Sequence, residues 1–138
     1  MSGITVGEFN AIIDEDLPWA AEVGMRAVET GEATATLVVP FTESMLRPGG
    51  TISGPTMMAL ADACMYATVL AAIGPVKLAV TTNFNINFMR KPAECDLIAK
   101  GHVLKLGKRL CVLSVDITSD GSDELVAHAT GTYSIPPR

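Results

Sequence analysis

Asp62 is the residue with the clearest potential for chemistry, because it is the only charged side chain in the run 54–73. That run, GPTMMALADACMYATVLAAI, is apolar nearly all round, so it predicts a helix that lies in the core instead of one with a charged solvent-facing side. A carboxylate in such a helix is costly unless it is paired, hydrogen-bonded or open to a cavity. The isolation of Asp62 favours a functional role over that of a structural carboxylate held by backbone donors.

The start of the same helix offers a second group that could take part in a reaction. The N-terminus of a helix carries free N–H groups and the positive end of the macrodipole, which can stabilise a developing oxyanion. Gly54 suits this role because it lets a ligand approach the backbone closely. A purely structural interpretation is about as good, since Ser53 is a favourable cap and Pro55 suits the first turn. Pro55 has no N–H, so it leaves the donor role to its neighbours.

Composition limits the classes of protein that this chain can represent. The chain has 138 residues, of which 49% are hydrophobic and 18% are charged, so we expect one folded domain over 1–138 and no intrinsic disorder. The net charge of −5 and the absence of a basic run argue against a nucleic-acid or anionic membrane surface as partner.

The three cysteines, Cys64, Cys95 and Cys111, stand in unrelated contexts without a C-x-x-C pair. We therefore expect neither a zinc site nor a disulfide framework, and the pattern fits a reducing, cytoplasmic location. No other metal or cofactor is expected. The first residues show no signal-peptide pattern. The long apolar helix is interrupted by Asp62 and closed by Gly74-Pro75, which leaves too little for a membrane span.

Apolar periodicity predicts the elements that must position these groups. Helical spacing predicts a helix over 6–16 that ends before Pro18. Residues 40–53, with Pro48-Gly49-Gly50, are expected to form a loop before the buried helix. Alternation and turn residues predict strands at six places, namely 20–29, 32–39, 77–89, 96–106, 109–118 and 124–135. The order α-β-β-α-β-β-β-β indicates an α+β layer with a curved antiparallel sheet packed around one helix.

This order, together with three segments of sequence, resembles the hot-dog fold, and within it the small acyl-CoA thioesterases of the phenylacetate-pathway (PaaI-like) type. The segments are SGPTMMALADACMYA at 53–67, AVTTNFNINFMRKPA at 79–93 and LVAHATGTYSI at 125–135. The resemblance covers the chain from about residue 20 onward. It implies hydrolysis of an acyl-CoA substrate without a cofactor by a homodimer or a dimer of dimers.

The first segment departs from the pattern of the family at its start. The family helix opens with His-Gly-Gly, and the catalytic carboxylate follows nine positions after the His. Counting back from Asp62, the His position holds Ser53, the first Gly is Gly54 and the second is Pro55. Many relatives carry an Asn seven residues before the first Gly, where this chain has Arg47. The resemblance thus implies catalytic roles for Asp62 and Gly54, with Ser53, Pro55 and Arg47 forming an altered rim of the substrate site.

The second segment adds three residues to the expected site. Relatives carry a Ser or Thr on the strand after the helix, and Thr81 matches that position, where it could orient water or hydrogen-bond the carboxylate. Arg90 and Lys91 follow this strand directly, and the match of Arg90 to the family segment favours a seat for the phosphates of coenzyme A over a solvated charged rim.

The spacing of the two catalytic residues constrains how they can act together. Gly54 and Asp62 are separated by about 12 Å along the axis of one helix, so they cannot both touch one thioester carbon. If both act, Gly54 of one subunit must work with Asp62 of another, and the family resemblance implies the same shared site.

Two alternatives remain open from the sequence. Hydratases on this fold use a catalytic His beside an acid, but His102 and His128 have no acidic partner at a useful spacing in their strands. The non-enzyme alternative is an acyl-CoA-binding or regulatory protein. The departures at Ser53 and Pro55 favour it, and the retained Asp62 opposes it.

Overall fold

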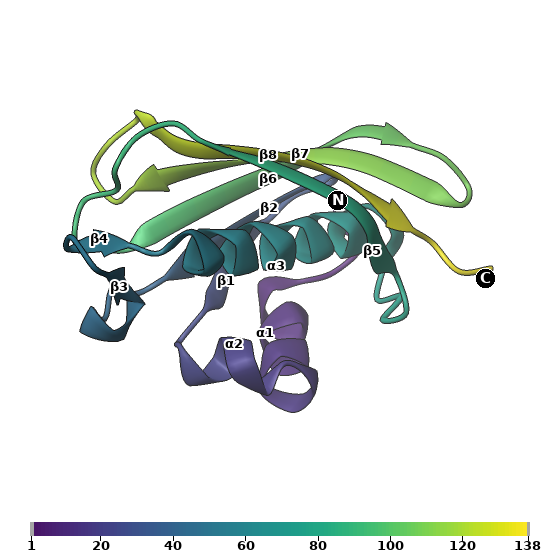
Figure 1. Cartoon of the computed structure of the whole chain (residues 1–138). Coiled ribbons are helices and arrows are strands. Elements are labelled where there is room, and N and C mark those ends of the chain that lie inside the picture. The colour runs from purple at the N-terminus through teal and green to yellow at the C-terminus, as the bar shows by residue number, and fades with distance from the viewer. Residues whose placement is uncertain (1, 138) are drawn as a thin grey trace.

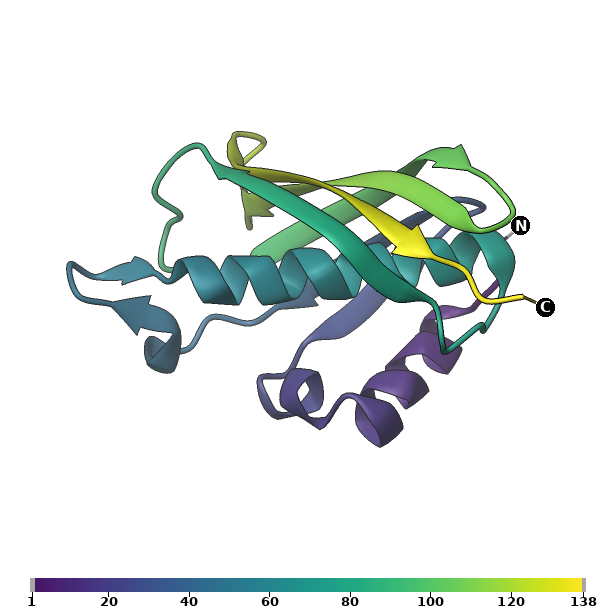
Figure 2. The same ribbon diagram turned by 45° about the vertical axis from the view of Figure 1, so that its right-hand side comes forward.

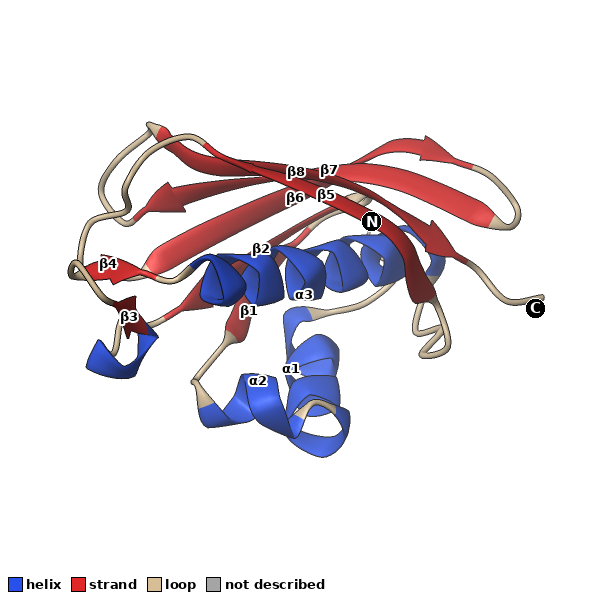
Figure 3. Ribbon diagram, in the orientation of Figure 1, coloured by secondary structure: helices blue, strands red, loops and turns tan. Residues whose placement is uncertain are grey.

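A six-stranded antiparallel sheet forms the upper layer of the molecule and curves around one long helix (Figures 1 and 3). The computed structural model describes residues 2–137. The strand order is β1-β2-β6-β7-β8-β5. The bounds of the strands are β1 Arg26–Thr30, β2 Thr34–Val39, β5 Val80–Phe88, β6 Leu97–Leu106, β7 Leu110–Ser119 and β8 Leu125–Ser134. This arrangement confirms the expected α+β architecture.

Helix α3, Gly54–Ile73, is the central helix that the apolar run predicted. The Ser53 side chain caps its first turn by accepting from the backbone N–H of Thr56, and Gly74 ends it with φ at 94°. Leu60, Met65 and Leu70 are fully buried. By length and composition alone α3 could cross a membrane, so the expectation that Asp62 and Gly74-Pro75 leave too little for a span was wrong. Most of the helix is nevertheless buried within the fold.

Two short helices lie on the side of α3 that the sheet leaves open and cover part of it (Figure 2). Helix α1, Val6–Asp16, matches the predicted bounds and begins with a capping box between Thr5 and Glu8. Helix α2, Pro18–Glu22, is new, and it shows that a strand beginning at residue 20 was the wrong prediction. The physical reason is that Pro18 occupies the first position of a second helix, which proline favours.

The predicted loop over 40–53 holds more structure than expected. It contains the 3₁₀ turn η1, Glu43–Met45, and a small hairpin of β3, Leu46–Arg47, with β4, Thr51–Ile52. Gly49 and Gly50 turn this hairpin with φ at 101° and 76°. The hairpin leads directly into the cap of α3.

Strand β5 lies at one edge of the sheet and is paired on one side only, with β8. Most of its side chains are exposed, whereas Phe84 and Ile86 are half-buried and pack against the core. An exposed nine-residue edge with apolar side chains is a ready template for pairing with another strand.

A close approach between α3 and the sheet depends on glycine. A Cβ at Gly131 on β8 would lie 2.8 Å from Met65 Sδ and 2.9 Å from the backbone oxygen of Asn83. Neither contact is compatible with ordinary packing, so the helix rests against bare backbone at this point.

We therefore expect Gly131→Ala to lower the free energy of unfolding by about 1–3 kcal/mol, because the added methyl group overpacks the space between β8, β5 and α3. Chemical denaturation measures the change. Gly7→Ala on α1 is the matched control, since the nearest atom to its Cβ would be Thr5 Oγ1 at 4.0 Å. An unfolding midpoint for Gly131→Ala equal to that of the parent would show that the helix can move away from the sheet without cost.

Candidate active site

Asp62 lies on α3 where the helix meets strands β5 and β8 and lines two hollows. Its side chain is partly exposed. Its Oδ1 atom accepts a hydrogen bond from Thr81 Oγ1 at 2.8 Å and another from the Tyr133 hydroxyl at 2.9 Å. Within residues 2–137, no hydrogen bond reaches its second oxygen, Oδ2. One oxygen is thus held in place while the other is free to act as a base or nucleophile.

The strand register explains why Thr81 and Tyr133 meet at this carboxylate. The two residues are direct partners in the antiparallel ladder between β5 and β8. Side chains of directly opposed residues lie on the same face of a sheet. Here that face is turned toward α3, so a single cross-strand pair supplies both hydroxyl donors.

Tyr133 is the site residue that the sequence prediction missed. It is 3% exposed, and its hydroxyl also contacts the backbone oxygen of Asp62 at 3.1 Å. Burial raises the pKa of Tyr133 above its ordinary value, and the charge of Asp62 raises it further. The phenol therefore remains a donor at neutral pH. A signal was present in the sequence, because a Tyr at an inward-facing position of a strand needs a hydrogen-bond partner.

A cavity of about 560 Å³ opens beside the carboxylate, between α3, β5 and the two N-terminal helices. Apolar and aromatic side chains form most of its wall, among them Ile12, Leu17, Trp19, Tyr66 and Val80. The Tyr66 ring stacks on Tyr133 with 6.3 Å between ring centroids. An ion pair between Lys77 Nζ and Asp16 Oδ2, at 2.9 Å, lies in the wall.

A second hollow of about 400 Å³ adjoins the other side of the carboxylate. Met58, Ala59 and Phe84 line it together with Asp62 and Thr81. Asp62 therefore stands between two apolar spaces, one inside the chain and one that opens toward the exposed edge strand.

The N-terminus of α3 is kept apart from Asp62 within one chain, since both lie on the same helix. Ser53 caps the helix, and its Oγ also lies 2.8 Å from Thr56 Oγ1. Pro55 is exposed in the first turn. A Cβ at Gly54 would lie 3.4 Å from the Phe88 ring, so Gly54 sits against the far end of β5.

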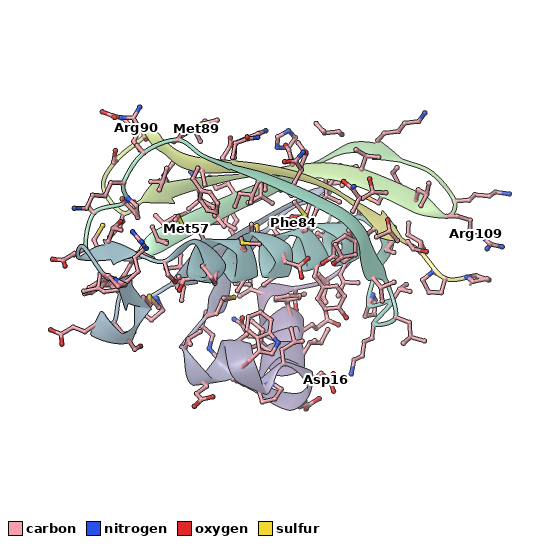
Figure 4. All side chains as sticks on the ribbon, in the orientation of Figure 1. Asp16, Met57, Phe84, Met89, Arg90 and Arg109 are labelled. Carbon is pink, nitrogen blue, oxygen red and sulfur yellow. The ribbon has the colours of Figure 1, made fainter. Side chains whose placement is uncertain are left out.

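None of the cationic residues predicted for substrate binding lines the hollows beside Asp62, and Arg47 lies on a different element from Arg90 and Lys91. Arg47 is exposed on the β3–β4 hairpin. Arg90 is exposed beyond β5, forms an ion pair with Glu124 and donates from Nε to the backbone oxygen of Leu125 at 2.9 Å. Lys91 is exposed beside it. Figure 4 shows Arg90 and Arg109 at opposite ends of the molecule, so the cations of the later chain do not form one cluster.

One histidine has a partner that the sequence prediction did not find. His128 Nδ1 lies 2.6 Å from Asp116 Oδ1, because the two residues are opposed in the β7–β8 ladder. The prediction considered spacing within one strand only. His102 lies beside Ser114 on the neighbouring pair of strands. Over residues 2–137, no group of three or more His, Cys, Asp or Glu side chains could hold a metal ion.

Comparisons with known proteins agree with this arrangement. Residues 49–126 match the model of the thioesterase superfamily. A Thermoplasma acidophilum protein, classed as an esterase by inference, is 32% identical over 104 residues, which are 75% of this chain and 77% of that protein. A crystal structure from Silicibacter sp. TM1040, described as a thioesterase by inference, has a TM-score of 0.88 and 40% identity over 99% of this chain and 95% of the other.

The fold is also shared with more distant structures. The Escherichia coli PaaI protein of the phenylacetic acid degradation operon has a TM-score of 0.82 and 22% identity, covering 93% of this chain and 90% of that one. The sheet wrapped around α3 is thus the hot-dog fold of this class of hydrolase. The chain belongs to the thioesterase superfamily, and it shares its fold with the PaaI protein.

Removing the hydroxyl of Tyr133, the residue that the sequence prediction missed, should slow thioester hydrolysis and leave the cavity intact. We expect Tyr133→Phe to lower kcat by about 10- to 100-fold, because a hydrogen bond to a charged group contributes about 1.5–3 kcal/mol. Steady-state kinetics on a thioester substrate measure the loss. The matched control is Tyr66→Phe, whose hydroxyl lies in the same wall but donates to the backbone oxygen of Lys77 at 2.9 Å. Equal losses in both variants would remove Tyr133 from its specific role at Asp62.

Proposed function

We propose that this protein hydrolyses acyl-CoA thioesters to the free acid and CoA, with Asp62 as the catalytic carboxylate. The proposal rests on the different hydrogen bonding of the two carboxylate oxygens of Asp62. Oδ1 is held by two hydroxyl donors, Oδ2 accepts no hydrogen bond from residues 2–137, and Asp62 lines a mostly apolar cavity large enough for an acyl group. Positioned groups of this kind serve proton transfer or nucleophilic attack.

Asp62 can act by two routes, and both end in the same products. As a general base, Oδ2 takes a proton from water while the water oxygen bonds to the thioester carbon. The oxyanion then collapses, the C–S bond breaks, and the CoA thiolate takes up a proton. As a nucleophile, Oδ2 bonds to the carbon first, releases the thiolate and forms an anhydride that water cleaves. Single turnover in ¹⁸O-labelled water tests the second route. Label in Asp62 establishes an anhydride that water cleaves at the Asp62 carbon, because the general-base route places the label in the free acid.

The oxyanion needs donors that Asp62 cannot provide, and we propose that the N-terminus of α3 in a second copy supplies them. Antiparallel pairing of two β5 edges about Phe84 would set residue 88 of one copy opposite residue 80 of the other. Gly54 packs against Phe88, and Asp62 is bonded to Thr81 next to Val80. The same pairing therefore brings Gly54 of each copy toward Asp62 of the other.

Exposed apolar side chains support a homodimer of this form. Val80 is 53% exposed, Phe88 is 49% exposed and Met58, beside the second hollow, is 43% exposed. A second copy along β5 would cover them and satisfy the unpaired edge. The same pairing would set Arg90 and Lys91 of one copy near residue 78 of the other, close to the cavity where CoA phosphates would need cations. Pairing of such dimers into a dimer of dimers stays a prediction.

The departures at the helix start favour one alternative, a non-catalytic acyl-CoA-binding or regulatory protein. Pro55 provides no N–H where relatives have a glycine. Gly54 retains its N–H, whereas that of Thr56 bonds to the Ser53 side chain, and the retained Asp62 is the reason to prefer the enzyme. Arg47 stands on the hairpin before this turn, and we propose that it tunes the choice of substrate without acting in the chemical step.

The decisive substitution is Asp62→Asn, which keeps the shape of the side chain and removes its basicity. We expect hydrolysis of acyl-CoA to fall by about 10²-fold or more, while calorimetric titration shows acyl-CoA bound as tightly as before. Asp116→Asn is the control, because it removes a carboxylate that is paired with His128 instead. Normal turnover by Asp62→Asn would exclude Asp62 from the reaction, and binding without turnover by the unmodified protein would establish the binding-protein alternative.

Subunit mixing tests the shared site directly. Asp62→Asn and Gly54→Val should each be inactive alone, the second because a bulky side chain blocks the oxyanion position and meets Phe88. A heterodimer has one site with wild-type Gly54 from one copy and wild-type Asp62 from the other, so activity should return in part after exchange. Heterodimers that form without activity, or a purified monomer that turns over normally, would contradict the shared site.

A further inference from the structure

Trp19, the only tryptophan of the chain, has an unusual environment. It lies on α2, and 45% of it is exposed although large aromatic side chains are mostly buried. It lines the 560 Å³ cavity beside Asp62, and it also lines a separate cavity of about 280 Å³. Of all the described side chains, Trp19 alone belongs to both linings.

The two cavities follow one another along the open face of α3. The first touches Asp62, Ala63 and Tyr66, and the second touches Pro55, Thr56 and Ala59. Ala59 and Ala63 are four residues apart, so they lie on one face of the helix. Small side chains form the floor on each side of the indole, and Trp19 stands between the cavities as a partition.

The second cavity is mostly apolar. Val23, Met25, Val39 and Met45 line it together with the polar Ser44 and Thr56, and its lining includes no charged side chain. The first cavity has a polar limit of its own, the ion pair between Asp16 and Lys77. A longer acyl chain that extends from Asp62 toward the first cavity's polar end therefore meets the Asp16–Lys77 ion pair. One that extends past the indole of Trp19 enters further apolar space.

On the basis of the proposed function, we infer that Trp19 determines the length of acyl group that this enzyme accepts. The acyl group occupies the first cavity, and the indole closes it off from the second. The preferred substrates are then acyl-CoA thioesters whose acyl groups end within the first cavity. Trp19 lies outside residues 49–126, the part that matches the superfamily, so this limit would be a property of the N-terminal helices of this chain.

The inference predicts the effect of removing the partition. Each methylene moved from water into an apolar site is favourable enough to raise kcat/KM by about fourfold. In the unmodified enzyme this gain should stop once the first cavity is full. In Trp19→Ala it should continue into the second cavity, so the optimum shifts to longer acyl groups.

The experiment compares kcat/KM over straight-chain substrates from butyryl-CoA to palmitoyl-CoA. Trp19→Ala should move the optimum to longer chains, with a gain of about fourfold per added methylene, whereas Trp19→Phe should keep an optimum close to that of the parent. Val23→Ala enlarges the second cavity behind an intact indole and should leave the optimum where it was. An unchanged optimum in Trp19→Ala would overturn the inference.

A second measurement uses the unmodified indole and needs neither turnover nor a Trp19 variant. Because Trp19 is the only tryptophan, the emission of Asp62→Asn protein reports on this partition alone. Adding acyl-CoA should shift the emission progressively with acyl length, and free CoA should leave it unchanged. If the unmodified protein hydrolyses acyl-CoA but the emission does not depend on acyl length, the inference about Trp19 is overturned and the proposed function stands. A length-dependent shift in a protein without hydrolysis would overturn only the proposed reaction.

Discussion

A helix without a polar side can persist in water only if other elements cover it from every direction. In this molecule the curved sheet covers most of α3, and α1 and α2 cover part of what the sheet leaves. Coverage is incomplete along the stretch from Pro55 to Tyr66, where three hollows meet the helix. The candidate site is this remaining gap, so the same burial that stabilises the fold also creates an apolar space with one carboxylate in its floor.

The carboxylate persists in that apolar setting because the sheet supplies its partners. Two hydroxyls from one cross-strand pair, Thr81 and Tyr133, bond to Oδ1 and offset part of the cost of removing the charge from water. The arrangement also fixes the rotation of the carboxylate and leaves Oδ2 without a hydrogen bond from residues 2–137. The same two contacts therefore stabilise the charge and orient the carboxylate.

Edge strand β5 contributes both to the candidate site and to the interface of the proposed dimer. One end of it carries Thr81 beside Asp62, and the other end carries Phe88 beside Gly54. An antiparallel pair of such edges has twofold symmetry, so a residue near one end meets a residue near the other. In the proposed dimer, this symmetry overcomes the separation of Gly54 and Asp62 on a single rigid helix.

The sequence by itself determined the elements whose signals are local. Periodicity gave α1 and α3 with the observed bounds, alternation gave the later strands to within a few residues, and the isolated charge identified Asp62. Tertiary structure decided what depends on register between distant segments. Tyr133 meets Asp62, and His128 meets Asp116, only because particular residues are opposed across strands. Likewise, Trp19 lines two cavities that segments distant in the sequence form together, which no local pattern records.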